Sequence, residues 1–245
     1  MTAENADLRD MQKVYDSQAD AFNEKAPVLL TWEFINKPAI LRHFKDVYRL
    51  KNQALILDVG SATGRVVQTH VDAGIPANNI WGVEISPQEV KLAKKNIPGA
   101  HFSTGDIRTA KLPKNKFDGA TSSMVFEFLD EAGLDQALVN IYGSMKKGGK
   151  LVYVSTHPGR VEGKYNLTAR HSGWFKTGGP WGGDFENWHR SLKDYVKQTE
   201  SNGFEITEVE ELGMPKEAGK KFPERIKTFK TFDAPVRLVV CAHKK

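Results

Sequence analysis

The sequence predicts a doubly wound α/β fold built around a mostly parallel sheet, and three observations lead to this prediction. Short apolar segments alternate with amphipathic ones between residues 54 and 156, a pattern typical of strands joined by crossover helices. Glycines and acidic residues follow the ends of those segments. With 245 residues, 40% of them hydrophobic, the chain can bury one substantial core.

Two helices are expected before the first strand. The first spans residues 8–22, where Met11, Val14, Tyr15 and Phe22 form a helical stripe. The second spans residues 31–50. We therefore expect a helical cap over residues 1–50 ahead of a core at 54–156, within a single domain.

The core elements follow in order. The expected strands are 54–59, 80–86, 100–107, 117–124 and 150–156, and the expected helices are 65–74, one beginning at Ser86-Pro87, and 134–146. Ser86 is a good cap residue and proline suits the first helical position, while Gly148-Gly149 stops the last helix.

The C-terminal part supplies one helix and two strands. Ser191 and Asp194 form a capping-box-like start for a helix running to residue 202, and Gly203 ends it. Strands are expected at 204–211 and 235–242, with no helix between them.

The turn after the first strand is the main functional signal. Asp58 leads directly into a turn punctuated by Gly60 and Gly64, whose glycines permit positive φ and close approach of a ligand. A dinucleotide fingerprint would need glycines where Ala62 and Arg65 stand, so hydride transfer is disfavoured. An acid at this place suits an ammonium group better than a pyrophosphate.

Two further acids end the next strands. Glu84 comes 20 residues after Gly64, the offset expected of a carboxylate that binds ribose hydroxyls. Asp106 ends the third strand. Such a set suits a cofactor that carries an amino-acid head, a ribose and an adenine. The alternative is that these are ordinary turns, which favour glycine and aspartate for local reasons.

At these residues, over about positions 54–155, the chain resembles the class I S-adenosylmethionine-dependent methyltransferases. The resemblance implies a Rossmann-like sheet of order 3-2-1-4-5-7-6 with its last strand antiparallel. It places Asp58 and the 60–64 turn near the methionine moiety, Glu84 on the ribose diol and Asp106 on the adenine amino group. The implied cofactor contacts are Tyr15, Asp58, Gly60, Ser61, Ala62, Thr63, Gly64, Glu84, Ile85, Asp106, Ile107 and Ser123. Ile85 and Ile107 face the adenine, Ser123 lines the sulfur side, and Ala62 replaces the family's usual middle glycine.

The helix at 8–22 adds to the resemblance. Residues 15–22, YDSQADAF, are similar to a Y-D-x-x-A-x-x-[YF] pattern that the family carries in a helix over the cofactor. Tyr15 is then expected to close over the methionine end and to touch the substrate. The alternative is an aromatic ring packed between helices.

Residues 157–190 differ in composition from the rest of the chain. They are rich in glycine, contain Trp174, Trp181 and Trp188, and lack a sustained period. Because they follow strand five, they lie at the ligand-binding edge of the sheet, and we interpret them as a substrate lid. A small satellite core is the alternative. Residues 188–195, WHRSLKDY, resemble the capping region of small-molecule methyltransferases, including those that make toxoflavin-type heterocycles.

Methyl transfer depends mainly on positioning for in-line attack, and a base is needed only when the nucleophile must lose a proton early. The candidates are His189 and His157, since imidazole titrates near neutrality, and Glu127, just beyond strand four. Structural roles are the alternative for each.

The expected activity is methylation of nitrogen or oxygen on a small, aromatic or heterocyclic molecule. Two alternatives stay open: an RNA or protein methyltransferase, and a non-catalytic nucleotide-binding module. The net charge of +5 is modest, the fourth strand lacks an N/D-P-P-Y tetrad, and Cys241 is misplaced for attack on a pyrimidine, so nucleic acid is disfavoured.

Composition sets the remaining expectations. No apolar run has the length of a membrane span and the N-terminus does not resemble a signal peptide, so we expect a cytoplasmic protein without a membrane partner. The single Cys241 is expected to be buried, and no Cys/His cluster has metal-ligand spacing. The oligomeric state, monomer or homodimer, is left open.

Overall fold

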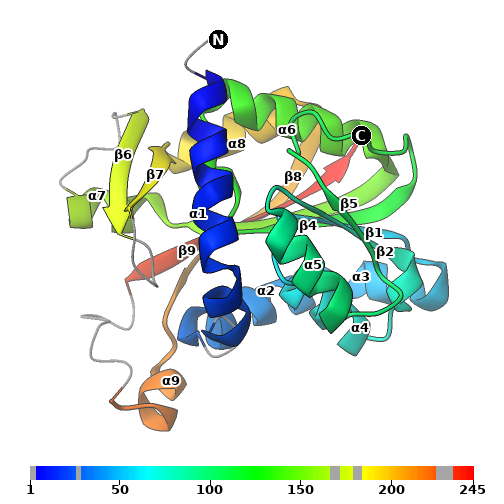
Figure 1. Cartoon of the computed structure of the whole chain (residues 1–245), viewed down its shortest axis with the longest axis horizontal. Helices are drawn as coiled ribbons and strands as arrows, with labels where there is room; N and C mark the ends of the chain where they lie inside the picture. The colour runs from blue at the N-terminus through cyan, green and yellow to red at the C-terminus, as the bar shows by residue number, and fades with distance from the viewer. Residues whose placement is uncertain (1–3, 26–28, 166–171, 179–183, 225–233) are drawn as a thin grey trace.

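A twisted seven-stranded sheet forms the centre of the computed structural model, which describes residues 4–25, 29–165, 172–178, 184–224 and 234–245 (Figure 1). Its order is β3-β2-β1-β4-β5-β9-β8. The strands are β1 (Ile56–Val59), β2 (Ile80–Glu84), β3 (His101–Thr104), β4 (Phe117–Ser123), β5 (Met145–Thr156), β8 (Phe204–Gly213) and β9 (Pro235–Lys244). Strand β9 runs opposite to the other six strands of this sheet, so its pairings with β5 and β8 are antiparallel. The predicted fold class and strand order are confirmed.

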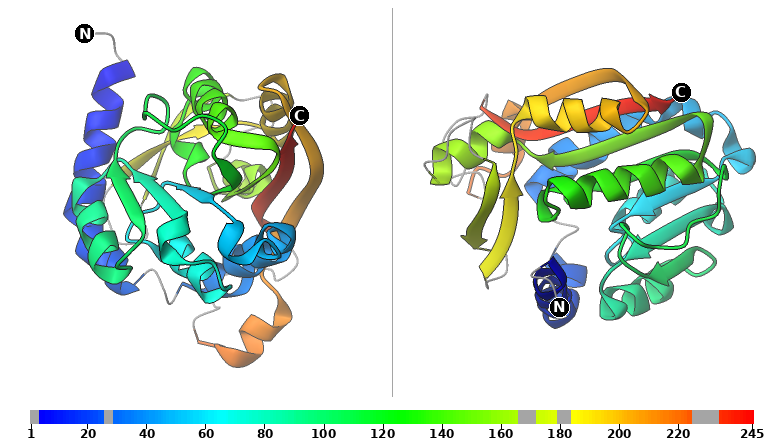
Figure 2. Two further views of the ribbon diagram at one scale, coloured as in Figure 1. Left: turned by 90° about the vertical axis from the view of Figure 1, so that its right-hand side faces the viewer. Right: turned by 90° about the horizontal axis from the view of Figure 1, so that it is seen from above.

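Helices cover both faces of the sheet (Figure 2). They are α1 (Glu4–Lys25), the π-helical turn η2 (Trp32–Asn36), α2 (Lys37–His43), α3 (Lys45–Tyr48), α4 (Arg65–Asp72), α5 (Pro87–Asn96), α6 (Glu131–Ser144), α7 (Pro158–Tyr165), α8 (Leu192–Ser201) and α9 (Lys216–Lys221), with short 3-10 turns η3 (Lys51–Gln53), η4 (Ala77–Asn79) and η5 (Phe126–Phe128). Along β5, Leu151 and Tyr153 face the core shared with α6 and α8, while Val152 and Val154 face the core shared with α2, α4 and α5. This two-residue period is what a strand buried on both faces requires.

The single helix predicted over residues 31–50 is wrong. The segment begins as the π-helical turn η2, continues as α2 with Pro38 in its first turn, and breaks at Phe44 (φ −95°, ψ 6°) before α3. Pro38 lacks the amide hydrogen that a continuous helix would need at that position. The break lets Phe44 pack, fully buried, against the sheet.

Residues 157–190 are more regular than predicted. The segment contains α7 and an antiparallel hairpin of β6 (Gly173–Gly178) and β7 (Asp184–His189), in which Trp174 pairs with Trp188. The two tryptophan rings meet edge to face with centroids 5.3 Å apart. A cross-strand aromatic pair stabilises such a hairpin, and the uneven glycine spacing hid its period of two.

Three other boundaries differ from the prediction. Helix α6 starts at Glu131 with Asp130 as its cap, and β5 starts at Met145, because a register shift opposite β4 absorbs the predicted Gly148-Gly149 stop. The short helix α9 lies between β8 and β9, where none was predicted, and Ala218 on it is buried. The Ser86 cap and the capping box of Ser191 are confirmed. Cys241 is buried, as predicted.

Candidate functional site

The glycine turn joins β1 to α4 in left-handed conformations. Gly60 has φ +68° and Gly64 has φ +95°, and Ala62 between them has φ +46°. The left-handed region costs a residue with a Cβ about 1–2 kcal/mol, so Ala62 keeps the backbone shape that a glycine there would adopt. A Cβ added at Gly60 would lie 2.2 Å from Cγ2 of Val125. Close packing of Val125 therefore requires glycine at position 60.

Glu84 ties this turn to the next one. Its Oε2 accepts a hydrogen bond from the Ala62 amide and its Oε1 accepts one from the Ser86 amide, both at 3.0 Å. Glu84 is buried, and burial raises the pKa of its carboxyl while the two amides oppose that rise. The Ile85 amide also bonds this carboxylate. A carboxylate has about four acceptor sites, so some acceptor capacity remains for a ligand.

Asp58 lies beneath the turn at the end of a hydrogen-bond chain. Its Oδ1 accepts from the Thr121 hydroxyl at 2.8 Å, and Thr121 in turn contacts His70, whose other ring nitrogen lies 2.9 Å from the Tyr48 hydroxyl. Oδ2 has no hydrogen-bond partner among the described residues. Burial raises the pKa of Asp58 to about 8, although Thr121 opposes the shift. A nearby cation would stabilise the ionised form.

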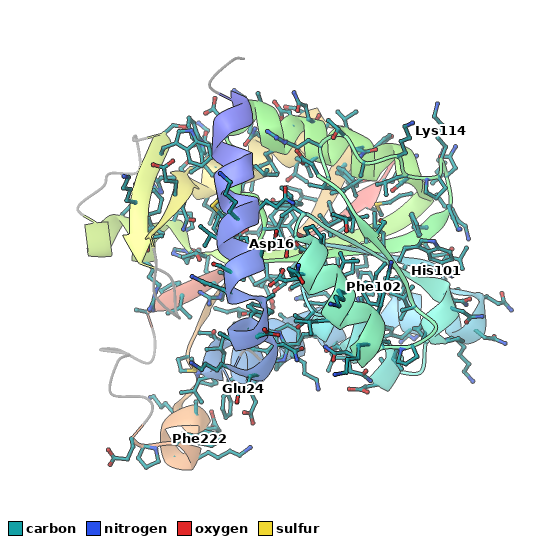
Figure 3. All side chains as sticks on the ribbon, viewed as in Figure 1. Asp16, Glu24, His101, Phe102, Lys114 and Phe222 are labelled. Carbon is teal, nitrogen blue, oxygen red and sulfur yellow. The ribbon has the colours of Figure 1, made fainter. Side chains whose placement is uncertain are left out.

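Helix α1 is attached to the start of α5 beside these acids. Oδ1 of Asp16 accepts hydrogen bonds from the Ser86 hydroxyl and, at 3.3 Å, from the Gln88 amide, and Figure 3 shows Asp16 facing α5. Glu89, in the first turn of α5, is 1% exposed, and its Oε1 has no hydrogen-bond partner in the described part of the chain. Burial, followed by the charges of Glu84 and Asp16, raises the pKa of Glu89 to about 9.

Tyr15, on α1, lies near the acidic residues that follow β2 and β4. Its ring packs edge to face on Phe128, with centroids 5.8 Å apart. Burial and the negative charges of Glu89, Glu84 and Glu127 raise the pKa of its hydroxyl well above the usual value. Tyr15 thus lies near both the acid of β2 and the acid beyond β4, and its contact with the cofactor stays a prediction.

The other predicted cofactor contacts lie along the same edge. Asp106 is engaged by its neighbour Arg108, whose Nε and backbone amide both donate to it at 2.9 Å. Ser123 accepts a hydrogen bond from Nδ2 of Asn36 at 3.3 Å. Ile85 is half-buried directly after β2, and Ile107 belongs to the core cluster on the α6 side. Ser61 and Thr63 are buried within the turn.

Glu127 lines a cavity beyond β4 and β5. Thr156 donates to its Oε1 at 3.3 Å, while Oε2 has no partner among the described residues. Burial raises the pKa of Glu127, and the charge of Arg237 opposes that shift. The cavity is lined by Glu127, Thr156, Pro158, Val161, Phe175, Asn187, Trp188, His189, Arg190 and Tyr195, from η5, β5, α7, the hairpin and α8.

The two candidate histidines differ in their surroundings. His189 is buried on the cavity wall, and its Nε2 lies 3.4 Å from a carboxylate oxygen of Glu162. His157 has structural partners at both ring nitrogens: Glu211 at 2.6 Å and the Gly159 amide at 3.1 Å. These contacts fit the structural alternative for His157.

Of the predicted substrate contacts, Trp188 lines the cavity and Trp174 is 38% exposed on the hairpin. Trp181 lies outside the described residues.

Sequence reasoning missed several buried polar residues at this edge. Asn36 joins the end of β4 to β9, because its side chain donates a hydrogen bond to Ser123 and accepts one from Nε of Arg237, each at 3.3 Å. It lay inside a predicted helix, and no local pattern distinguishes it. Glu89 stands three residues after Ser86, a spacing that suggests an exposed capping partner, but Glu84 takes the Ser86 amide instead.

One group of metal-ligand size occurs within the described ranges, formed by His43, Glu208 and Glu210. The two ring nitrogens of His43 face different carboxylates, and Arg42 also binds Glu210. This arrangement is an ion-pair network that joins α2 to β8. No helix in the described part of the chain has the length and apolar character needed to cross a membrane.

The sheet order, the left-handed turn after β1 and the acid that ends β2 define an α/β domain of the nucleoside-cofactor-binding class. A methyltransferase-domain family model matches residues 56–149. An uncharacterized methyltransferase of Anoxybacillus flavithermus is 26% identical over 106 residues, covering 43% of this chain. The match spans about half (49%) of that relative's length.

Solved structures agree on the fold. An S-adenosylmethionine-dependent methyltransferase from Mesorhizobium loti superposes with a TM-score of 0.66 at 19% identity, covering 89% of this chain and 99% of the other. The DhpI-SAM-HEP complex gives a TM-score of 0.66 at 12% identity, covering 99% and 100%. Residues 56–149 thus match a methyltransferase-domain family, and the chain shares the fold of solved S-adenosylmethionine-dependent methyltransferases.

Proposed function

We propose that this chain transfers a methyl group from S-adenosylmethionine to a nitrogen or oxygen atom of a small polar molecule. The observation that carries the proposal is Glu84: a buried carboxylate, held by the amides of Ala62 and Ser86, that keeps acceptor capacity for a diol. Its fixed position means that a ribose would meet a preorganised acceptor rather than a mobile side chain.

The neighbouring residues fit the rest of that cofactor. The left-handed backbone of the 60–64 turn suits contact of its amide groups with a ligand. Oδ2 of Asp58, which has no hydrogen-bond partner among the described residues, suits a site beside an ammonium group. Asp106 would hold the adenine amino group if it exchanged part of its pairing with Arg108. Tyr15 would exclude water from the methionine end, because α1 lies over that end of the cleft.

S-adenosylmethionine, when bound, supplies an electrophilic methyl group on a sulfonium. The protein's own contribution is to place the acceptor in line and to receive its proton. Glu127 is our first candidate for that proton, because it lines the cavity and its Oε2 has no hydrogen-bond partner in the described part of the chain. His189 is the second, since it lines the same cavity. Trp188, which lines the same cavity, would form its wall on the hairpin side.

The test is calorimetric titration with S-adenosylhomocysteine, the demethylated product. Wild-type protein should bind it, Glu84→Ala should lose binding, and Glu205→Ala, which removes an exposed carboxylate on β8, should not. Because Glu84 also supports two turns, circular dichroism of each variant must show a folded protein, and Glu84→Gln provides a milder second variant. Wild-type affinity in a folded Glu84→Ala protein would contradict the cofactor assignment. Methyl transfer itself is then measured by mass spectrometry on a panel of small hydroxyl and amine compounds.

A further inference from the structure

The cavity beyond β4 and β5 contains a concentration of buried polar atoms without partners. Oε2 of Glu127, Oδ1 of Asn187, Nε1 of Trp188 and Nε of Arg190 are all inaccessible to solvent and lack hydrogen-bond partners among the described residues. All four side chains line the same cavity. Buried polar groups in folded proteins are nearly always paired, so four such atoms around one cavity indicate a missing ligand or water.

The two nitrogen atoms in this set both require a hydrogen-bond acceptor. Nε of Arg190 and Nε1 of Trp188 can only donate hydrogen bonds. Arg190 is 1% exposed, and no ion pair joins it to a carboxylate in the described part of the chain. Its two terminal nitrogens are taken by backbone oxygens, since Nη1 donates to Phe126 at 2.7 Å and Nη2 donates to Leu129. The guanidinium also lies over the Tyr195 ring, with its central carbon 5.0 Å from the ring centroid, and it shares the cavity lining with Glu127.

The two oxygen atoms in this set both accept hydrogen bonds. Oε2 of Glu127 and Oδ1 of Asn187 would each receive a hydrogen bond from a hydroxyl or amine. The cavity measures about 10 Å³, room for about one water-sized group. It can therefore take one small functional group of an acceptor molecule but not a ring, so the rest of the molecule would lie outside the cavity.

We propose that this cavity selects acceptors that carry a carboxylate next to the hydroxyl or amine to be methylated. One carboxylate oxygen accepts hydrogen bonds from the N–H groups of Trp188 and Arg190. The nucleophile donates a hydrogen bond to Glu127 or to the amide oxygen of Asn187, and its proton passes to the Glu127 carboxylate when the methyl group is transferred. Arg190 has a positioning role as well, because its bonds to Phe126 and Leu129 hold the η5 turn that carries Glu127. This inference rests on the proposed methyltransferase function and specifies the substrate class of its acceptor site.

The test compares matched acid and amide probes on the protein saturated with S-adenosylhomocysteine. The probes are 2-hydroxybenzoate and 2-aminobenzoate against 2-hydroxybenzamide and 2-aminobenzamide, titrated by calorimetry. We expect the acids to bind at least about tenfold more tightly than the amides. Trp188→Phe removes one N–H and keeps an aromatic ring, and it should reduce acid binding about tenfold while changing amide binding little. Trp81→Phe is the matched control, because Trp81 stacks on His101 and does not line the cavity, and it should change neither.

Two results would overturn the inference. One is equal or absent binding of acids and amides by a wild-type protein that binds S-adenosylhomocysteine, which would mean that waters occupy the cavity. The other is an equal loss for acid and amide in Trp188→Phe, which would mean that the ring rather than its N–H matters. Failure of the proposed function is separate, because it appears first, as absent binding of S-adenosylhomocysteine.

Discussion

Replacing Glu89 by glutamine should stabilise the protein, and the gain should grow with pH. The folded state raises the pKa of Glu89 from 4.5 to about 9, so at neutral pH the native protein keeps a proton that the unfolded chain has released. Unfolding then liberates a proton, and the free energy of unfolding falls by about 1.4 kcal/mol per pH unit between those two pKa values. This is the reverse of the usual behaviour of a paired carboxylate.

The size of the effect at pH 7 follows from that slope. From the unfolded pKa of 4.5 to pH 7 the wild-type protein would lose about 3 kcal/mol through this single group. Glutamine is nearly isosteric and stays neutral at every pH, so Glu89→Gln avoids the loss. We expect the variant to exceed the wild type by about 2–3 kcal/mol at pH 7 and to match it near pH 4.5.

Urea unfolding followed by circular dichroism, from about pH 5 to about pH 8, measures both quantities. Glu205→Gln, which alters an exposed residue of β8, is the control and should show no pH-dependent gain. The reasoning would be refuted by a Glu89→Gln protein whose stability difference from the wild type is independent of pH. Such a result would mean that Glu89 is solvated or paired in solution.

Substitutions in the glycine turn, with Gly143 of α6 as a comparison, give further predictions. Gly60→Ala should cost several kcal/mol and abolish binding of S-adenosylhomocysteine, because its Cβ would overlap Val125. Gly143→Ala, inside α6 with nothing within 4 Å of the new Cβ, should instead stabilise the protein by about 0.5–1 kcal/mol, and thermal melts compare the two. Ala62→Gly should raise the melting temperature slightly, since it removes a left-handed penalty of about 1–2 kcal/mol while adding a smaller entropy cost in the unfolded chain. A melting temperature below that of the wild type would show that the turn is unstrained.

The sequence predicted those elements whose ends are fixed by local residue chemistry, such as strand ends and helix caps. The strand ends at Asp58 and Glu84 were predictable, because a buried strand followed by a turn leaves few places for an acid. Ser86 and Ser191 were predictable as caps for the same local reason. The strand order followed from the family resemblance rather than from any residue pattern.

The rest depended on contacts that sequence spacing does not encode. The break at Phe44 reflects how one ring packs on the sheet, and the hairpin of Trp174 and Trp188 shows its pairing only in three dimensions. Likewise, Glu89 has the spacing of a surface capping residue, and its burial becomes evident only once α1 covers α5. Burial of this kind is a tertiary property, which overrides local propensity.

The segment between β5 and α8 leaves and returns to the sheet at one place. At its start Thr156 bonds Glu127, and at its end Arg190 bonds the backbone of Phe126 and Leu129, so both ends meet at the η5 turn. A segment anchored at one place in this way could be replaced by a segment from another chain. Grafting another chain's segment between the same two anchors would be expected to alter acceptor choice while leaving the glycine turn and Glu84 undisturbed, which makes the protein a practical scaffold for engineering.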